Sequence, residues 1–363
     1  MTTTAGATQG FAAGDSFAVA AARSADLEAQ ITAHPERFRV LTGDRPTGAL
    51  HLGHYFGTLA NRVRLQDAGV DVVLVVADYQ VITDRDSVGA LSTTVLELVA
   101  DYLAAGIDPV RTTVFAHSAV AALNQLMLPF LSLVSDGELR RNPTVKAEAE
   151  ASGSRPLSGL LLTYPVHQAA DILFCKANLV PVGRDQLPHV EVTRTIARRF
   201  NERYAGGRQV FPAPDALLTA APVLLGTDGT KMSKSRGNAI ELRASEDETA
   251  RLIRGAKTDS DRVITFDPVN RPEVANLLLL ASLCTGRSEQ ALAEEVGGAG
   301  SGALKGLVTE VVNEHLRPLR VRRADIAADR GQLLGVLRAG NLRARELAEA
   351  TLDEVREAMD MTY

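Results

Sequence analysis

Apolar residues follow two patterns along the chain, and the change comes near residue 245. Before it, short β-branched runs alternate with longer stretches of helical periodicity, which is typical of a parallel sheet with crossover helices. Three runs predict strands: FRVLTG at 38–43, VDVVLVVADY at 70–79 and TTVFAHS at 112–118. The spacing over 91–106 predicts a helix that stops at its glycine. In such α/β folds, ligands bind beyond the carboxyl ends of the strands.

After residue 245 the alternation ends, and the apolar spacing predicts helices over 273–283, 304–317 and 331–359. We therefore predict an all-helical domain at 245–363, following an α/β domain at 36–244. Residues 1–35, rich in Ala, Thr, Gly and Ser, predict a poorly ordered extension. Arginines gather in the helical domain, among them Arg322 and Arg323, on what is either a solvated face or a binding surface.

Composition narrows the class of protein. Hydrophobic residues make up 45% and charged residues 23%, the balance of an ordinary globular chain. No apolar run approaches the roughly 20 residues needed to cross a bilayer. The net charge of −5 means that nucleic acid would have to be bound through a local basic patch. Cys175 and Cys284 lack the spacing of a zinc site or disulfide framework, so we expect a cytoplasmic protein.

Two histidines stand three residues apart at the start of a predicted helix. In GDRPTGALHLGHYFG, residues 43–57, Pro46 and Gly48 set a tight turn before the helical periodicity begins. Residues three apart share a face, so His51 and His54 project together, and Gly53 lets a ligand approach the backbone. The first turn of a helix offers N–H groups to a phosphate. The pair is a phosphate site, a metal pair without an evident third ligand, or two surface histidines.

A second candidate lies in GTDGTKMSKSRGN, residues 226–238. Its glycines and serines predict a mobile loop, which brings Lys231 and Lys234 as two positive charges. Charge that arrives with a loop stabilises the negative charge that develops on a polyphosphate leaving group. A lysine- and serine-rich loop without chemistry is the alternative.

A third candidate is a polar face on an apolar helix. Tyr164, Gln168 and Asp171 stand at positions i, i+4 and i+7 among apolar neighbours, so they share one face. Buried polar groups need partners, which makes this face a hydrogen-bond network or a substrate site. The Asp171 carboxylate would accept a hydrogen bond from an indole N–H or from a phenol.

Taken together, HLGH at 51–54, KMSKS at 231–235 and the preceding PTG at 46–48 resemble the paired signatures of class I aminoacyl-tRNA synthetases. The resemblance implies a dinucleotide-binding, Rossmann-like catalytic domain that carries the KMSKS loop. It is closest to the subgroup for tryptophan and tyrosine. AADIL at 169–173, LVPVGRDQ at 179–186, HVEVTRTIARRFN at 189–201, YLAAGIDP at 102–109 and AKTDS at 256–260 are similar to tryptophanyl-tRNA synthetases.

The resemblance assigns roles to individual positions. It implies His51, His54, Lys231 and Lys234 as the catalytic residues. Tryptophan would be bound by Asp171, as acceptor for the indole nitrogen, with Gln168, Tyr164, Gln80 and Gln186. ATP would be bound by Arg45, Pro46, Thr47, Gly53, His54, Gly183, Arg184, Asp185, Val223, Lys231, Met232, Ser233, Lys234 and Ser235. Lys146 matches a phosphate-contacting lysine, and no residue is implied as a metal ligand.

Four positions depart from the commonest bacterial pattern. His54 stands in place of Asn, Arg45 in place of Gln, Gln168 in place of Met and Gln80 in place of His. The changes at Gln168 and Gln80 make the expected indole pocket more polar. Its affinity for tryptophan, or for inhibitors that mimic it, is therefore expected to differ from the common form, and tyrosine stays an alternative substrate.

The resemblance implies the reaction and its partners. The tryptophan carboxylate attacks the α-phosphorus of ATP, Mg²⁺ shares the charge of the departing pyrophosphate, and the adenylate then esterifies tRNA(Trp). A homodimer is implied, with the apolar segment LNQLMLPFLSLVS at 123–135 as interface or core, and the helical domain becomes the anticodon-binding domain. Replacing Arg322 and Arg323 is then expected to weaken tRNA charging alone. The other functions that we consider are a small-molecule adenylyltransferase and a non-catalytic synthetase paralogue.

Overall fold

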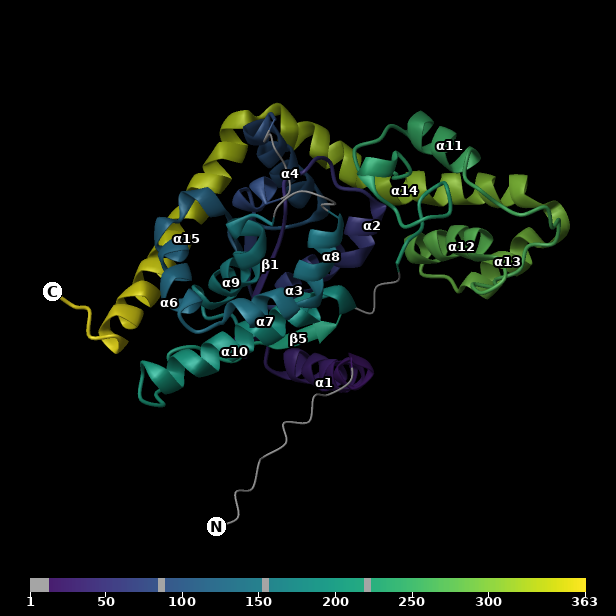
Figure 1. The fold of residues 1–363 in the computed structure, drawn as a ribbon. Helices are drawn as coiled ribbons and strands as arrows, with labels where there is room; N and C mark the ends of the chain where they lie inside the picture. Colours follow the sequence, from purple (N-terminus) through teal and green to yellow (C-terminus); the bar gives the residue numbers. More distant parts are fainter. Residues whose placement is uncertain (1–12, 84–88, 152–156, 219–222) are drawn as a thin grey trace, which may run out of the picture.

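Five strands form one parallel sheet in the computed structural model, which describes residues 13–83, 89–151, 157–218 and 223–363 (Figure 1). The strands are β1 (Arg39–Asp44), β2 (Asp71–Val76), β3 (Thr112–Ala116), β4 (Leu179–Val182) and β5 (Asp215–Leu218). Their order is β3-β2-β1-β4-β5. The chain builds outward from β1 to β3 and then returns to the other side of β1, so the topological switch point lies between β1 and β4. The three strands predicted from the sequence are confirmed.

Ten helices of the described chain precede or surround this sheet. They are α1 (Ala13–Ala33), α2 (Leu52–His54), α3 (Ala60–Ala68), α4 (Leu91–Ala105), α5 (Ala121–Gln125), α6 (Met127–Leu131), α7 (Asp136–Arg141), α8 (Pro143–Ala151), α9 (Gly159–Leu173) and α10 (Leu187–Arg203). Helix α4 ends where the sequence predicts, because Gly106 takes a left-handed φ of 114° that favours glycine. A π-helical turn, η2 (Tyr55–Leu59), joins α2 to α3.

Five more helices follow: α11 (Glu246–Arg254), α12 (Pro272–Thr285), α13 (Glu289–Val296), α14 (Ser301–Ala328) and α15 (Arg330–Ala358). Figure 1 shows α11 to α14 gathered on one side of the molecule, whereas α15 runs back along the sheet region. Helix α14 continues well past its predicted end and contains Pro318. No helix in the described chain is long and apolar enough to span a membrane.

Alternate residues of β2 join different cores, as a strand buried on both faces requires. Leu74 and Val76 pack in a core that continues through α4 into α12 and α14. Val73 and Val75 pack in a second core with α9, α10 and α15. The sheet region and the C-terminal helices therefore share buried apolar contacts.

Helix α1 covers the β5 edge of the sheet. Leu27 and Ile31 are buried against β1, β2 and β5, and Ser24 Oγ accepts a hydrogen bond of 2.9 Å from Leu218 N. The prediction of a poorly ordered extension is therefore wrong for Ala13–Ala33; residues 1–12 lie outside the described chain. The prediction from composition failed because an alanine-rich sequence also favours a helix. The buried residues Leu27 and Ile31 stand at i and i+4, which is the spacing of a helix.

Helix α15 covers the opposite edge, β3. A side chain at Gly340 would overlap the carbonyl of Val114, so only glycine allows this approach. Asn341 Oδ1 accepts a 2.9 Å hydrogen bond from Ala116 N, and Arg343 donates to Pro109 O at 2.7 Å. Both edges of the sheet are thus closed to pairing with another strand.

Candidate active site

A cavity of about 320 Å³ opens at the carboxyl ends of β1 and β4, at the switch point of the sheet. Its size falls within the ~300–1,000 Å³ range of small-molecule sites. The five residues assigned to tryptophan by sequence all line it: Gln80, Tyr164, Gln168, Asp171 and Gln186. The strand ends contribute Leu41, Thr42, Gly43, Asp44, Val180, Pro181, Val182 and Gly183.

The polar face of α9 lies where the helical spacing predicts. Ser158 caps the start of the helix, because its Oγ accepts from Leu161 N at 3.0 Å. Tyr164 and Asp171 are nearly buried, with 6% and 4% of their surfaces exposed. The Tyr164 hydroxyl lies 3.1 Å from His189 Nε2. Asp171 is hydrogen-bonded through Oδ1 to His117 Nε2.

Sequence reasoning missed two histidines behind this face. His117 follows β3 and is fully buried, and His167 precedes Asp171 by one turn of α9. Their rings stack 4.4 Å apart with planes within 7° of parallel. His117 could have been found from its position, since it directly follows a predicted strand, at the end where ligands bind.

His167 is held on both sides. Its Nδ1 lies 3.0 Å from Gln80 Nε2, which donates, and its Nε2 lies 2.8 Å from Asn124 Oδ1, which accepts. These partners fix the neutral Nε2–H tautomer. Burial lowers the pKa of His167, and the charge of His117 lowers it further, while Asp171 opposes both.

By residue type, His117, His167 and Asp171 form a group in the described chain that could hold a metal ion. Their hydrogen bonds argue against that role. Both nitrogens of His167 and the Nε2 of His117 already have protein partners, and stacked parallel rings do not converge on a common point. We therefore interpret the group as a hydrogen-bond network beneath the cavity.

The HLGH turn holds its two histidines against each other. Their ring centroids lie 3.7 Å apart, and His51 N donates to His54 Nδ1 at 3.3 Å, which leaves Nε2–H of a neutral His54 as a donor. Burial lowers the pKa of His51 to about 3, helped by the charges of His54 and Lys234. Burial likewise lowers the pKa of His54 to about 4, with Lys234 and Arg62 adding to it against Asp44. Both histidines are neutral donors at neutral pH.

The KMSKS segment lies directly on this turn. A Cβ added at Gly48 would lie 3.7 Å from Lys234 Nζ, and one added at Gly53 would lie 3.6 Å from Met232 Sδ. The backbones are also joined, because Leu52 N donates to Ile240 O at 3.0 Å and Leu242 N donates to Leu50 O at 2.9 Å. The two motifs, some 180 residues apart in sequence, therefore form one site.

Comparison with known proteins settles what this pairing of motifs means. A family model described as "tRNA synthetases class I (W and Y)" matches residues 33–317. The chain belongs to this family.

Three similar proteins are enzymes for tryptophan. The tryptophan--tRNA ligase of Clostridium longisporum is 39% identical over 336 residues, covering 89% of this chain and 97% of the relative. That of Treponema pallidum is 40% identical over 331 residues, with the same coverage. The tryptophanyl-tRNA synthetase of Campylobacter jejuni, solved with ADP and tryptophan, matches with a TM-score of 0.78 at 30% identity. That match covers 89% of this chain and 99% of the solved one.

The other positions that sequence assigned to ATP surround the turn and the end of β4 in this synthetase. Arg45 lines the cavity, Pro46 is buried, and Thr47 N donates to Arg45 O at 2.8 Å. Gly183 also lines the cavity, while Arg184 and Asp185 are exposed beside it. Further positions lie along the KMSKS segment: Val223 is 68% exposed, Lys231 is exposed, and Ser233 and Ser235 flank Lys234. Lys146 is exposed on α8 and is absent from the cavity lining.

The lysine segment of the synthetase is folded around one asparagine, to which the sequence motifs assign no role. Asn238, 2% exposed, accepts from Ser233 N at 2.8 Å and donates to Asp228 Oδ1 at 2.7 Å and to Lys231 O at 3.2 Å. A side chain at Gly226 would overlap the Asn238 amide. These bonds give the segment a defined conformation in this structure, and its mobility stays a prediction.

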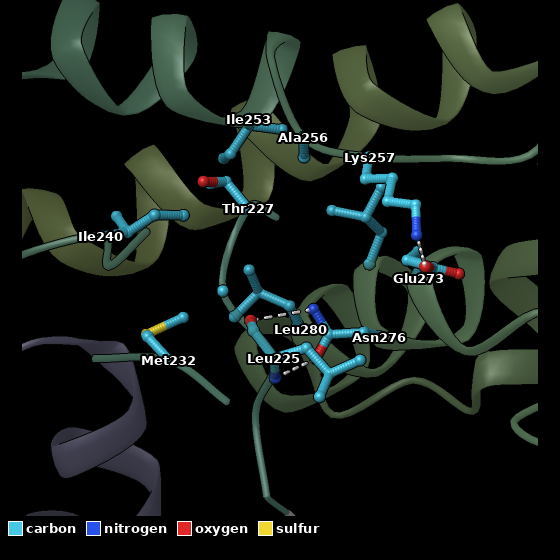
Figure 2. Close-up of a pocket in the computed structure, with 12 residues that line it drawn as sticks. Leu225, Thr227, Met232, Ile240, Ile253, Ala256, Lys257, Glu273, Asn276 and Leu280 are labelled. Carbon is cyan, nitrogen blue, oxygen red and sulfur yellow. Dashed lines mark hydrogen bonds and ion pairs between the residues drawn. The ribbon is translucent and has the colours of Figure 1, made fainter. Parts of the chain in front are cut away.

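The base of the segment is fastened to the C-terminal helices, as Figure 2 shows. Asn276 of α12 bonds both backbone groups of Leu225, at 2.8 Å from its N and 3.2 Å from its O. The space between them, about 20 Å³ beside Met232, is of the size of a water molecule and is not a substrate site. Movement of α12 would therefore displace the lysine segment with it.

Two arginines expected to contact tRNA form hydrogen bonds to α4 of the synthetase. Arg323 Nε lies 2.5 Å from Asp101 Oδ1 and its other end pairs with Glu97, both on α4. The second oxygen of Asp101 accepts from Leu50 N at 3.1 Å, immediately before His51. Arg322 Nε donates to Ala104 O at 2.9 Å. Arg323 thus connects α14 to the HLGH turn, which changes the expected result of replacing it.

Proposed function

We propose that this chain is a tryptophan--tRNA ligase, which activates L-tryptophan with ATP and transfers it to tRNA(Trp). The observation that carries the proposal is the meeting of the HLGH histidines with Lys234. His54 also interacts with Asp44, which lines the same cavity as the Asp171 face. The family match and the relatives named tryptophan--tRNA ligase support it.

Asp171 accepts the indole N–H in this proposal. It is nearly buried yet lines the cavity, so its carboxylate pairs with a donor that enters there. A site built around such a bond binds ligands that lack the donor more weakly, since a buried acceptor would then stay unpaired. Gln168, Gln80 and Gln186 add amide groups to the wall, and we propose that they orient the ring and the amino-acid end.

His51 and His54 hydrogen-bond the phosphates as neutral donors, and Lys234 supplies charge. Catalysis then consists of positioning the tryptophan carboxylate in line with the α-phosphorus and stabilising the departing pyrophosphate. Lys231, exposed on the same segment, adds a second charge at the outer phosphates.

Mg²⁺ enters as part of the substrate. Asp44, the carboxylate at the end of β1, already accepts from Arg62 and from Tyr102 Oη, the latter at 2.7 Å. These donors hold the pKa of Asp44 at about 2 against the opposing effect of burial. Since the Asp44 carboxylate is already bonded to Arg62 and Tyr102, we propose that Mg²⁺ is held by the phosphates, where it shares their charge.

We further propose a cytoplasmic homodimer whose C-terminal helices bind the anticodon. Leu128 of α6, within the apolar segment 123–135, is 73% exposed beside half-buried Met127 and Leu131. The two thiols, Cys175 and Cys284, are unpaired, as in a reducing compartment. Sedimentation of wild type and Leu128→Glu tests the dimer, which should dissociate only in the variant.

Amino-acid-dependent ATP–pyrophosphate exchange with tryptophan and tyrosine tests the activity. We expect exchange with tryptophan, and charging of tRNA(Trp), but little exchange with tyrosine. Preference for tyrosine would overturn the substrate, and exchange with neither would overturn the enzyme. In Asp171→Asn, the KM for tryptophan should rise by about 10- to 100-fold.

A further inference from the structure

The histidine pair behind the cavity suggests a residue that acts on tryptophan through Asp171. We propose that His117 is a positioning residue of the tryptophan pocket: its Nε2–H binds Oδ1 of Asp171 and leaves Oδ2 to accept the indole N–H. This inference rests on the proposed role of Asp171.

Only one ring nitrogen of His117 is hydrogen-bonded within the described chain. It is fully buried, its Nε2 bonds Asp171, and its Nδ1 has no hydrogen-bond partner in the described chain. A buried polar atom without a partner is costly, so a histidine kept here must be compensated by what its other nitrogen does. The pair with Asp171 is that compensation.

The pair also gives the buried carboxylate a donor. A carboxylate that is 4% exposed has lost most of its contact with water, so its oxygens need donors from the protein. Burial would lower the pKa of His117, but Asp171 and the nearby Asp78 more than offset this and raise it. The Nε2–H of His117 is thus one of the donors that Asp171 needs.

The neighbours of His117 fix its ring. His167 stacks on one face, and His167 is itself fixed by Gln80 and Asn124. Thr83 Oγ1 donates to Gln80 Oε1 at 3.2 Å, so the Gln80 amide is oriented as well. Because Gln80 lines the cavity, this chain of contacts runs from the pocket wall through His167 to the ring that holds Asp171.

The test compares His117→Leu, which has no donor, with His117→Gln, which keeps a neutral one. Each is measured by ATP–pyrophosphate exchange with tryptophan and with 3-benzothienylalanine, an analogue whose sulfur replaces the ring N–H. We expect His117→Leu to raise the KM for tryptophan by about 10- to 100-fold, and His117→Gln to raise it less. The kcat, the KM for ATP and the KM for the analogue should change by less than about threefold, since only binding through the ring N–H is lost.

Three results separate this inference from the proposed function and from simple misfolding. An unchanged KM for tryptophan in His117→Leu, with Asp171→Asn impaired, would overturn the role of His117 alone. An unchanged KM in Asp171→Asn would overturn the proposed role of Asp171. If His117→Leu impaired tryptophan, the analogue and ATP alike, His117 would be structural only, and the inference would fail. His34→Leu, an exposed histidine at the end of α1, is the control and should behave as wild type.

Discussion

Replacing Arg323 by alanine should impair the whole enzyme and not only its use of tRNA. The guanidinium is the cationic partner of Asp101, whose side chain is 1% exposed, while the Arg323 side chain is 13% exposed. In Arg323→Ala, Asp101 becomes a buried carboxylate that has lost its hydrogen-bonded cation and keeps only the longer-range attraction of Arg243 and Lys234. Within the described chain, Asp101 also accepts a hydrogen bond from Leu50 N, next to His51 of the HLGH turn.

The expected loss of stability follows from this burial. Removing one partner of a buried ion pair costs about 3–5 kcal/mol, because the remaining charge is left uncompensated. Arg323 is slightly exposed and its second partner, Glu97, is more so, which places the expectation near the lower end, about 3 kcal/mol. Arg323→Ala combined with Asp101→Asn removes the stranded charge but keeps an oxygen for Leu50 N. The double variant should be about 1–2 kcal/mol more stable than Arg323→Ala.

Urea unfolding, ATP–pyrophosphate exchange and tRNA charging measure these effects on the same preparations. Exchange and charging should fall by the same factor in Arg323→Ala. The matched control is Arg317→Ala on the same helix, whose 54% exposed side chain pairs with exposed Glu246 and Glu314. It should lose less than about 1 kcal/mol. Loss of charging with normal exchange and normal stability in Arg323→Ala would refute the reasoning and return this arginine to the RNA surface.

The dependence on pH gives a second check. Burial raises the pKa of Asp101 above its ordinary value, although Arg323 opposes the shift. Without Arg323 the folded protein holds the proton of Asp101 more tightly than the unfolded chain does, so stability falls as pH rises. The destabilisation of Arg323→Ala should therefore be largest near neutral pH and shrink toward about pH 5.

Three further predictions concern the ATP side. Gly53→Ala would place a Cβ 3.0 Å from His51 Cε1, and displacing that ring should lower kcat in pyrophosphate exchange by about 10- to 100-fold with little change in the KM for tryptophan. Asn238→Ala removes the acceptor for Ser233 N, and we expect kcat/KM for ATP to fall about tenfold. A nucleotide titration that showed normal affinity for ATP in this variant would contradict the expectation. Since the folded-state pKa values of His51 and His54 are about 3 and 4, below the ~6.5 of an unfolded histidine, the free energy of unfolding should fall as pH drops from about 7 to 4. In His51→Asn and His54→Asn, urea unfolding should show a smaller decrease of the free energy of unfolding over this pH range than in wild type. An equal decrease would refute the low pKa of these histidines.

Much of the fold could be predicted because its signals are local. The runs that became β1 to β3 are apolar and β-branched, and the end of α4 at Gly106 needs only the residues around it. The α9 face was found from helical spacing alone, and its three polar residues do line one cavity. Strands β4 and β5, of four residues each, were not predicted, since so short a run carries little periodicity.

Features that depend on residues far apart in sequence were out of reach. His117 and Asp171 are 54 residues apart, and Arg323 and Asp101 are 222 apart. Arg317 and Arg323 look alike in sequence, because charge patterning does not show which arginine has a buried carboxylate opposite it. The joining of HLGH to KMSKS came from a family resemblance and not from spacing, and the structure supplies the contacts at Gly48 and Gly53 that explain it.

Helix α15, which covers β3, also determines when the enzyme can complete its folding. Ala116 meets its partner Asn341 only 225 residues later in the chain. At ~5–20 residues per second, the ribosome needs about 10–45 s to make that span. Throughout that time α15 does not cover the edge of β3, so this edge is open to pairing with other strands. Activity should therefore arise after release, and a chain stopped before Gly340 should be a client for quality control and not a smaller enzyme.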